Sequence, residues 1–248
     1  LVENIIIKTQ GFVSGNFSEN DDAPIEKFRE FLNLYKGIGK SELRENMKYF
    51  LEAIMPTCEE CGMNMCVHPD DPPIPVLGLP RIVNSREDIR WFLDAVPNVH
   101  NGLTFCAGSL SAGAQNDVVA MAKEFAERTH FVHLRSCHIF PNGDFTEASH
   151  LGGRADLIEL CRIFEEEGRR RASLPSGQSS LDANLPMRVD HGMTFTDQRG
   201  GLFDESSHGH NAGYTLLGRM FALAQVQGIM ATVDRELGID YKQPGFYD

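Results

Sequence analysis

The chain has 248 residues, of which 42% are hydrophobic and 23% are charged, so it has enough apolar material for a full core. Its net charge is −12 with histidine neutral, which argues against a nucleic-acid partner, because phosphate binding needs clustered lysine and arginine. No run approaches the ~18 consecutive apolar residues of a membrane span, so the sequence also predicts no membrane partner.

Helices and short apolar strands alternate along the chain. Residues 24–36 and 40–61 are predicted to be helical because apolar side chains recur every three or four residues, and Gly62 is predicted to end the second helix. The later elements, in chain order, are a strand at 63–67, a helix at 85–96 capped by Ser85, a strand at 103–106, a helix at 116–127 capped by Asn116, a strand at 131–134, a helix at 154–171, a strand at 186–189 and a helix at 213–236.

This alternation predicts an α/β fold built from βαβ units around a parallel sheet. Four such units are half of a (β/α)8 TIM-like barrel, so residues 1–248 are expected to form a single domain that covers roughly the C-terminal half of one. An open doubly wound sheet is the alternative, although no glycine-rich nucleotide-binding motif follows a strand. The polar segments 172–184 and 194–210 are predicted to be flexible loops.

Each of the four predicted strands ends in a side chain that can bind a metal. These residues are His68, Cys106, His133 and Asp190. One such residue alone is more often part of the core, but four at the same strand position indicate a metal site, because neighbouring parallel strands lie only ~4.8 Å apart. Thiolate and imidazole suit zinc, iron or cobalt, and a carboxylate also suits manganese.

Other polar groups follow the same strand ends. Asp70 lies in a proline-braced loop and is either a substrate-binding residue or part of a plain turn. Arg135 could meet a substrate carboxylate with two hydrogen bonds, or else form a buried ion pair. His191 is a candidate general acid or base, or a residue that orients Asp190. Asn211 and Tyr214 lie around the start of the last predicted helix. Asn211 is a candidate for substrate binding, and Tyr214 either transfers a proton or packs as an aromatic side chain at the helix start.

The six cysteines do not have the spacing of a small disulfide scaffold, and no signal peptide is visible at residue 1. A reducing cytoplasm is therefore the expected compartment. Cys58 and Cys61 form a CxxC pair, but they fall in a predicted helix and no second pair follows. They are interpreted as two thiols one turn apart rather than as a zinc knuckle or a redox pair.

Several motifs together resemble one enzyme family. They are HPDDPP at 68–73, GLPRI at 78–82, TFCAGS at 104–109, HLR at 133–135, FTEASH at 145–150, MRVDHG at 187–192 and GYTLLGR at 213–219. Their order and spacing resemble those of mannonate dehydratase from about residue 24 onward. The family is longer at the N-terminus by roughly half a barrel, and it usually has a histidine where this sequence has Met193.

The resemblance implies a TIM-like barrel and a hydro-lyase that converts D-mannonate to 2-dehydro-3-deoxy-D-gluconate plus water, in hexuronate (glucuronate) catabolism. It implies one divalent metal, Mn²⁺ or Fe²⁺, held by the four strand-end residues identified above. It implies that His191 and Tyr214 are the catalytic acid and base, with neither role assigned. The expected partners are a sugar-acid substrate and a second copy of the chain in a homodimer.

Two other functions are compatible with the strand-end residues. A metal-dependent sugar isomerase or epimerase on a similar barrel is the first, although such enzymes usually favour carboxylate ligands over a cysteine. A non-catalytic module stabilised by a closed metal site is the second. Within the dehydratase interpretation, the sequence does not distinguish mannonate from an epimeric hexonate.

Overall fold

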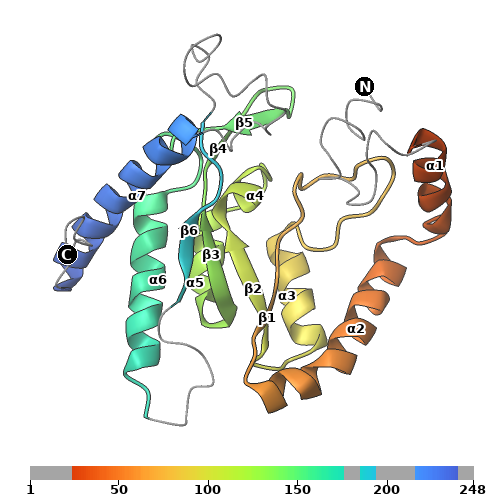
Figure 1. Cartoon of the computed structure of the whole chain (residues 1–248), viewed down its shortest axis with the longest axis horizontal. Helices are drawn as coiled ribbons and strands as arrows, with labels where there is room; N and C mark the ends of the chain where they lie inside the picture. The colour runs from red at the N-terminus through yellow and green to blue at the C-terminus, as the bar shows by residue number, and fades with distance from the viewer. Residues whose placement is uncertain (1–23, 176–184, 194–215, 240–248) are drawn as a thin grey trace.

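The computed structural model describes residues 24–175, 185–193 and 216–239. Within these ranges helices and strands alternate, as Figure 1 shows. The elements are α1 (Pro24–Leu34), α2 (Lys40–Cys61), β1 (Met65–Val67), α3 (Arg86–Ala95), β2 (Asn101–Cys106), α4 (Ala107–Ser111), α5 (Val118–Phe125), the 3-10 turn η2 (Ala126–Arg128), β3 (Thr129–Leu134), β4 (Cys137–Ile139), β5 (Phe145–Glu147), α6 (Leu157–Ala172), β6 (Met187–Val189) and α7 (Leu216–Leu237).

The central sheet has four strands in the order β1-β2-β3-β6, and every neighbouring pair is parallel. This confirms the predicted α/β fold with a parallel sheet. The register pairs Cys106 with His133 and Leu134 with Val189. Because the strands are parallel, their carboxyl ends lie along one edge of the sheet. Every residue that directly follows a strand is therefore brought to that edge.

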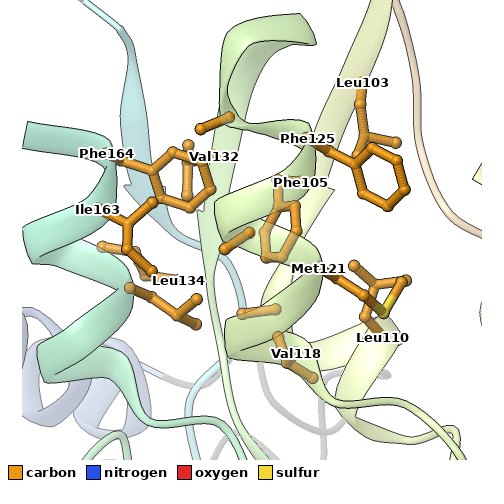
Figure 2. Close-up of a cluster of buried hydrophobic side chains, with 14 of the residues drawn as sticks. Leu103, Phe105, Leu110, Val118, Met121, Phe125, Val132, Leu134, Ile163 and Phe164 are labelled. Carbon is orange, nitrogen blue, oxygen red and sulfur yellow. The ribbon is translucent and has the colours of Figure 1, made fainter. Parts of the chain in front are cut away.

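The core lies between one face of the sheet and the helices that connect the strands. Phe105 of β2 and Phe164 of α6 are both fully buried, and their ring centroids lie 5.1 Å apart. Figure 2 shows that the side chains of alternate strand residues point into this layer. The labelled residues are Leu103, Phe105, Leu110, Val118, Met121, Phe125, Val132, Leu134, Ile163 and Phe164. This alternation leaves the residues in between for the opposite face.

The opposite face of the sheet is only partly covered by the described residues. Cys66 on β1 is exposed, Phe131 on β3 is half-buried, and the side chain of Arg188 on β6 is 44% exposed. No further strand pairs with β1 or β6 within the described ranges. The sheet therefore has two open edges and one incompletely covered face in this part of the chain.

Two predicted helix ends are confirmed, whereas α1 ends at Leu34 rather than at residue 36, α6 begins at Leu157 rather than at residue 154, and the cap of α5 differs. Gly62 ends α2 in the left-handed conformation at φ +62°, and the Ser85 side chain accepts the backbone N–H of Asp88 at the start of α3, both as predicted. Asn116 was predicted to cap α5, and this prediction was wrong. The cap is Asp117, because the Asn116 amide donates instead to the buried carbonyl oxygen of Leu110.

A short antiparallel hairpin, β4–β5, follows β3 and was not predicted. Its register pairs Cys137 with Glu147. In Figure 1 the hairpin lies beside α4 at the end of the sheet where β2 and β3 finish. The hairpin therefore brings residues that belong to no strand of the main sheet close to the carboxyl ends of those strands.

The CxxC pair lies on α2 as interpreted from the sequence, with Cys58 buried in the core and Cys61 exposed. Among the described helices, α7 is long and apolar enough to cross a membrane by length and composition alone. The same test selects core helices of globular proteins. Ala222, Val226 and Val233 of α7 pack into the core beside α6 and β6, so one face of the helix belongs to the core, although the described residues bury only 28% of its apolar stretch.

Candidate metal centre

The four predicted ligands converge on one point at the carboxyl edge of the sheet. One ligand atom from each of His68, Cys106, His133 and Asp190 lies within 4.8 Å of the others. Nε2 of His68 is 3.2 Å from Nδ1 of His133, which is 3.7 Å from Oδ2 of Asp190, and that oxygen is 3.9 Å from Sγ of Cys106. The parallel register described above produces this cluster, because each residue lies within one position of the carboxyl end of a strand.

These separations fit a single metal ion. Protein ligands 2.0–2.3 Å from a common transition-metal ion lie roughly 3.3–4.5 Å from one another. The three separations given above lie close to that range. The donor set of two imidazoles, one thiolate and one carboxylate also suits a transition metal better than magnesium or calcium.

Neighbouring groups hold the ligands in place. Nδ1 of His68 lies 2.7 Å from the carbonyl oxygen of Pro69, which leaves Nε2 facing the cluster. Oδ1 of Asp190 accepts from Arg188 at 3.1 Å, so that Oδ2 is the oxygen directed at the other ligands. The hydroxyl of Ser109 lies 3.2 Å from Sγ of Cys106. Such outer contacts orient metal ligands and fix histidine tautomers.

His191 lies between two carboxylates beside the cluster. Its Nε2 is 3.5 Å from Oδ2 of Asp190, and its Nδ1 is 3.4 Å from Oε1 of Glu147 on β5. The ring is only 14% exposed. This position is compatible with both predicted roles of His191, proton transfer and orientation of Asp190.

The guanidinium of Arg135 forms the buried ion pair that the sequence left as an alternative to substrate binding. Its Nε and Nη2 donate to the Glu147 carboxylate at 2.7–3.0 Å, and its Nη1 contacts Asp71. The side chain is 4% exposed. All three guanidinium nitrogens are thus engaged with protein carboxylates.

Arg135 changes the acidity of both carboxylates. Burial alone would raise the pKa of Asp71, but the charge and hydrogen bond of Arg135 outweigh it and lower that pKa below its ordinary value. Burial is likewise outweighed at Glu147, whose pKa is lowered by hydrogen bonds from His191 and Arg135. Both carboxylates are therefore held in the charged form, and they raise the pKa of Arg135.

The remaining candidates lie at the edge of the site or beyond the described residues. One carboxylate oxygen of Asp70 accepts the backbone N–H groups of Ile82 and Val83 at 2.8 and 2.7 Å, as in the turn-forming alternative. Asn211 and Tyr214 lie outside the described residues, as do residues 176–184 of the predicted loop 172–184 and the whole of the loop 194–210.

Two contributors to the site, Ser109 and Glu147, were not identified from the sequence, which places Asp71 only in the proline-braced loop. The Ser109 hydroxyl lies 2.9 Å from Asp71 as well as 3.2 Å from Cys106, so it joins the ligand to the ion pair. All three residues lie inside the motifs quoted above, but their pairings connect distant parts of the chain. Gly108 belongs with them, because a Cβ there would lie 2.3 Å from the stem of Arg135.

The fold and the site together define a parallel α/β protein with a candidate transition-metal centre at the carboxyl ends of its strands. The family model for D-mannonate dehydratase (UxuA) matches residues 2–239, and the chain belongs to that family. This confirms the family resemblance drawn from the motifs.

Individual relatives give the same result. The chain is 41% identical to mannonate dehydratase of Marinomonas sp. (strain MWYL1) over 92% of its length, and 39% identical to that of Chromohalobacter salexigens over 84%. A crystal structure of mannonate dehydratase from Streptococcus suis serotype 2 aligns with a TM-score of 0.65 at 29% identity, covering 85% of this chain. The chain spans 54% and 50% of the two sequence relatives and 56% of the crystal structure.

Proposed function

We propose that the chain is the C-terminal half of a (β/α)8 barrel and folds as one domain. The support is the four-stranded parallel sheet with two open edges, together with the chain's span of about half the length of its relatives. Closing an eight-stranded barrel would pair both edges and fill the incompletely covered face with side chains. The half-buried Phe131 on that face would then belong to the barrel interior.

The proposed reaction is the dehydration of D-mannonate to 2-dehydro-3-deoxy-D-gluconate, a hydro-lyase step in hexuronate (glucuronate) catabolism. The observation that carries this proposal is the convergence of His68, Cys106, His133 and Asp190 at the strand ends, in a chain of the mannonate dehydratase family. The active sites of such barrels lie at this end of the strands.

The proposed cofactor is one divalent metal ion, Mn²⁺ or Fe²⁺, held by those four residues. When bound, it would act as a Lewis acid for the substrate's carboxylate or neighbouring hydroxyl. The mixed donor set supports a transition metal, and the enzyme family supports a catalytic rather than a purely structural site.

Dehydration needs a base to take the weakly acidic proton beside the substrate carboxylate and an acid to protonate the departing hydroxyl. We assign these two steps to His191 and Tyr214. His191 is supported by its position 3.5 Å from the ligand Asp190. Tyr214 is supported by the family motif alone, since it lies outside the described residues.

Substrate contacts are assigned to Asp70 and Asn211, with Arg135 acting at the rim of the site through its ion pairs. The contacts of Arg135 favour the buried-pair alternative, because each of its three nitrogens already donates to a protein carboxylate and the side chain is 4% exposed. Asp70 and Asn211 rest on the sequence motifs. The proposed partners are the sugar acid and a second copy of the chain in a dimer, and the proposed compartment is the cytoplasm.

The test is turnover of D-mannonate by the full-length protein that carries this chain, with Mn²⁺ added, after chelation, and after Mn²⁺ is restored. We expect the 2-keto-3-deoxy product only when metal is present. Cys106→Ser should lose metal and turnover together. The matched control is Cys66→Ser, on the neighbouring strand but outside the cluster.

Two results would refute parts of this proposal. Turnover that survives in a Cys106→Ser protein with no bound metal would refute the metal site. A metal-loaded protein that leaves D-mannonate unchanged would refute the substrate, and product analysis with epimeric hexonates and with ketoses would then separate another acid dehydratase from a sugar isomerase.

A further inference from the structure

The side chain of Glu147 joins two parts of the site that sequence motifs treat separately. It comes from the β4–β5 hairpin rather than from the main sheet, and it is 16% exposed. On one side its carboxylate receives the fork of Arg135, and on the other it faces Nδ1 of His191 at 3.4 Å. No other described carboxylate has ion-pair contacts with both of these residues.

The guanidinium of Arg135 is fixed by carboxylates on two sides. Its guanidinium is clamped between Glu147 and Asp71, and two parallel N–H groups give the Glu147 contact a fixed geometry. Its stem passes so close to Gly108 that a Cβ there would lie 2.3 Å away. Because Arg135 cannot shift, the carboxylate of Glu147 is fixed as well.

A fixed carboxylate beside Nδ1 determines which way the imidazole of His191 faces. With Nδ1 directed at Glu147, Nε2 is directed at Oδ2 of Asp190 and hence at the metal cluster. Turning the ring over would place ring carbons against both carboxylates and lose both contacts. The hydrogen bond made by one ring nitrogen sets which nitrogen carries the proton.

We propose that Glu147 is a positioning residue for proton transfer: held by Arg135, it fixes the imidazole of His191 with Nδ1 facing Glu147 and Nε2 facing the cluster of candidate metal ligands. This inference rests on the proposed dehydratase function for the role of His191. It gives Arg135 and the β4–β5 hairpin a task in the reaction without any contact between them and the substrate.

Glu147→Gln tests the proposal. The fork of Arg135 takes the one amide oxygen of glutamine, so the amide NH₂ turns towards His191 and requires an unprotonated Nδ1. We expect kcat on D-mannonate to fall roughly 10- to 100-fold, the loss seen when a partner that orients a metal-site group is removed. KM should change less than about threefold, because ground-state binding is untouched. Bound metal should stay unchanged.

A second measurement does not depend on activity. In ¹⁵N-histidine-labelled protein loaded with Zn²⁺, long-range ¹H–¹⁵N correlation at about pH 8, above the ordinary imidazole pKa, reports which nitrogen of His191 carries the proton. His191→Gln assigns the signals. We expect protonated Nδ1 in the unaltered protein and loss of that proton in Glu147→Gln.

The matched control is Glu124→Gln. Glu124 also pairs with two arginines, Arg86 and Arg90, but on the surface of α5 away from the cluster. It should leave kcat and the His191 signals unchanged. An unaltered His191 tautomer in Glu147→Gln, or an unaltered kcat, would overturn the positioning role. If the unaltered protein fails to dehydrate D-mannonate, the function is refuted, and the tautomer measurement still decides whether Glu147 orients His191.

Discussion

Acidification should destabilise the fold through His130. This residue is the second of β3 and is 9% exposed. Its Nε2 lies 3.0 Å from the carbonyl oxygen of Val99. Its Nδ1 has no hydrogen-bond partner among the described residues. Burial, reinforced by the nearby charge of Arg171, lowers the pKa of His130 from 6.5 to about 4. The neutral ring is thus the form that fits the fold.

The difference between the pKa of His130 in the folded and in the unfolded chain sets the size and the sign of the effect on the free energy of unfolding. Between pH 6.5 and pH 4 the unfolded chain takes up a proton at position 130 that the folded chain refuses, so stability falls as pH falls. At about 1.4 kcal/mol per tenfold change in proton affinity, the full loss is about 3 kcal/mol. That is a large share of the roughly 5–15 kcal/mol that holds an ordinary domain together.

The assay is urea unfolding between pH 4 and pH 8, followed by the fluorescence of Trp91, the only tryptophan of the chain. His130→Gln keeps a donor for Val99 but cannot titrate, so its free energy of unfolding should depend less on pH in this window than that of the unaltered protein. His138→Gln, at an exposed histidine of β4, should keep the original dependence. Parallel curves for the His130→Gln and unaltered proteins would refute the argument.

Three further outcomes are expected. Ser109→Ala removes the hydroxyl beside the Cys106 thiol and should weaken metal binding roughly 10-fold in a chelator competition. Gly192→Ala places a Cβ 2.2 Å from the backbone oxygen of Gly218 on α7, so urea unfolding should show a loss of about 1–3 kcal/mol, which an unchanged midpoint would contradict. Chelation should abolish turnover, and added Mn²⁺ should restore it. The control is an unfolding curve of the metal-free protein, because turnover can return only if the chain stays folded without the ion.

The convergence of the four candidate metal ligands could be predicted because its signal is local. Each ligand directly follows or ends a run of apolar residues, and parallel strands place such positions side by side whatever the loops between them do. The relative order of His68, Cys106, His133 and Asp190 along the sheet therefore follows from the chain order of the strands.

The surroundings of the cluster could not be predicted because they depend on pairings between distant segments. Glu147 is one of many acidic residues in the sequence, and only the hairpin brings it to Arg135 and His191. The same cause explains why Asn116 was wrongly predicted as the cap of α5. Asn116 and Asp117 are both good capping residues, and the choice is made by a buried carbonyl that Asn116 meets only in the folded chain.

If the four candidate ligands hold an ion, their position on the sheet would link metal occupancy to the order of the outermost strands of the described sheet. His68 follows β1 and Asp190 follows β6, which are the first and last strands of the described sheet. An ion bound to both residues would connect β1 and β6 across β2 and β3. Fraying of either strand would therefore lower the affinity for the ion. Metal release and the loosening of the sheet at its margins would then be a single cooperative event, and the rate at which the ion exchanges would report how often those margins open.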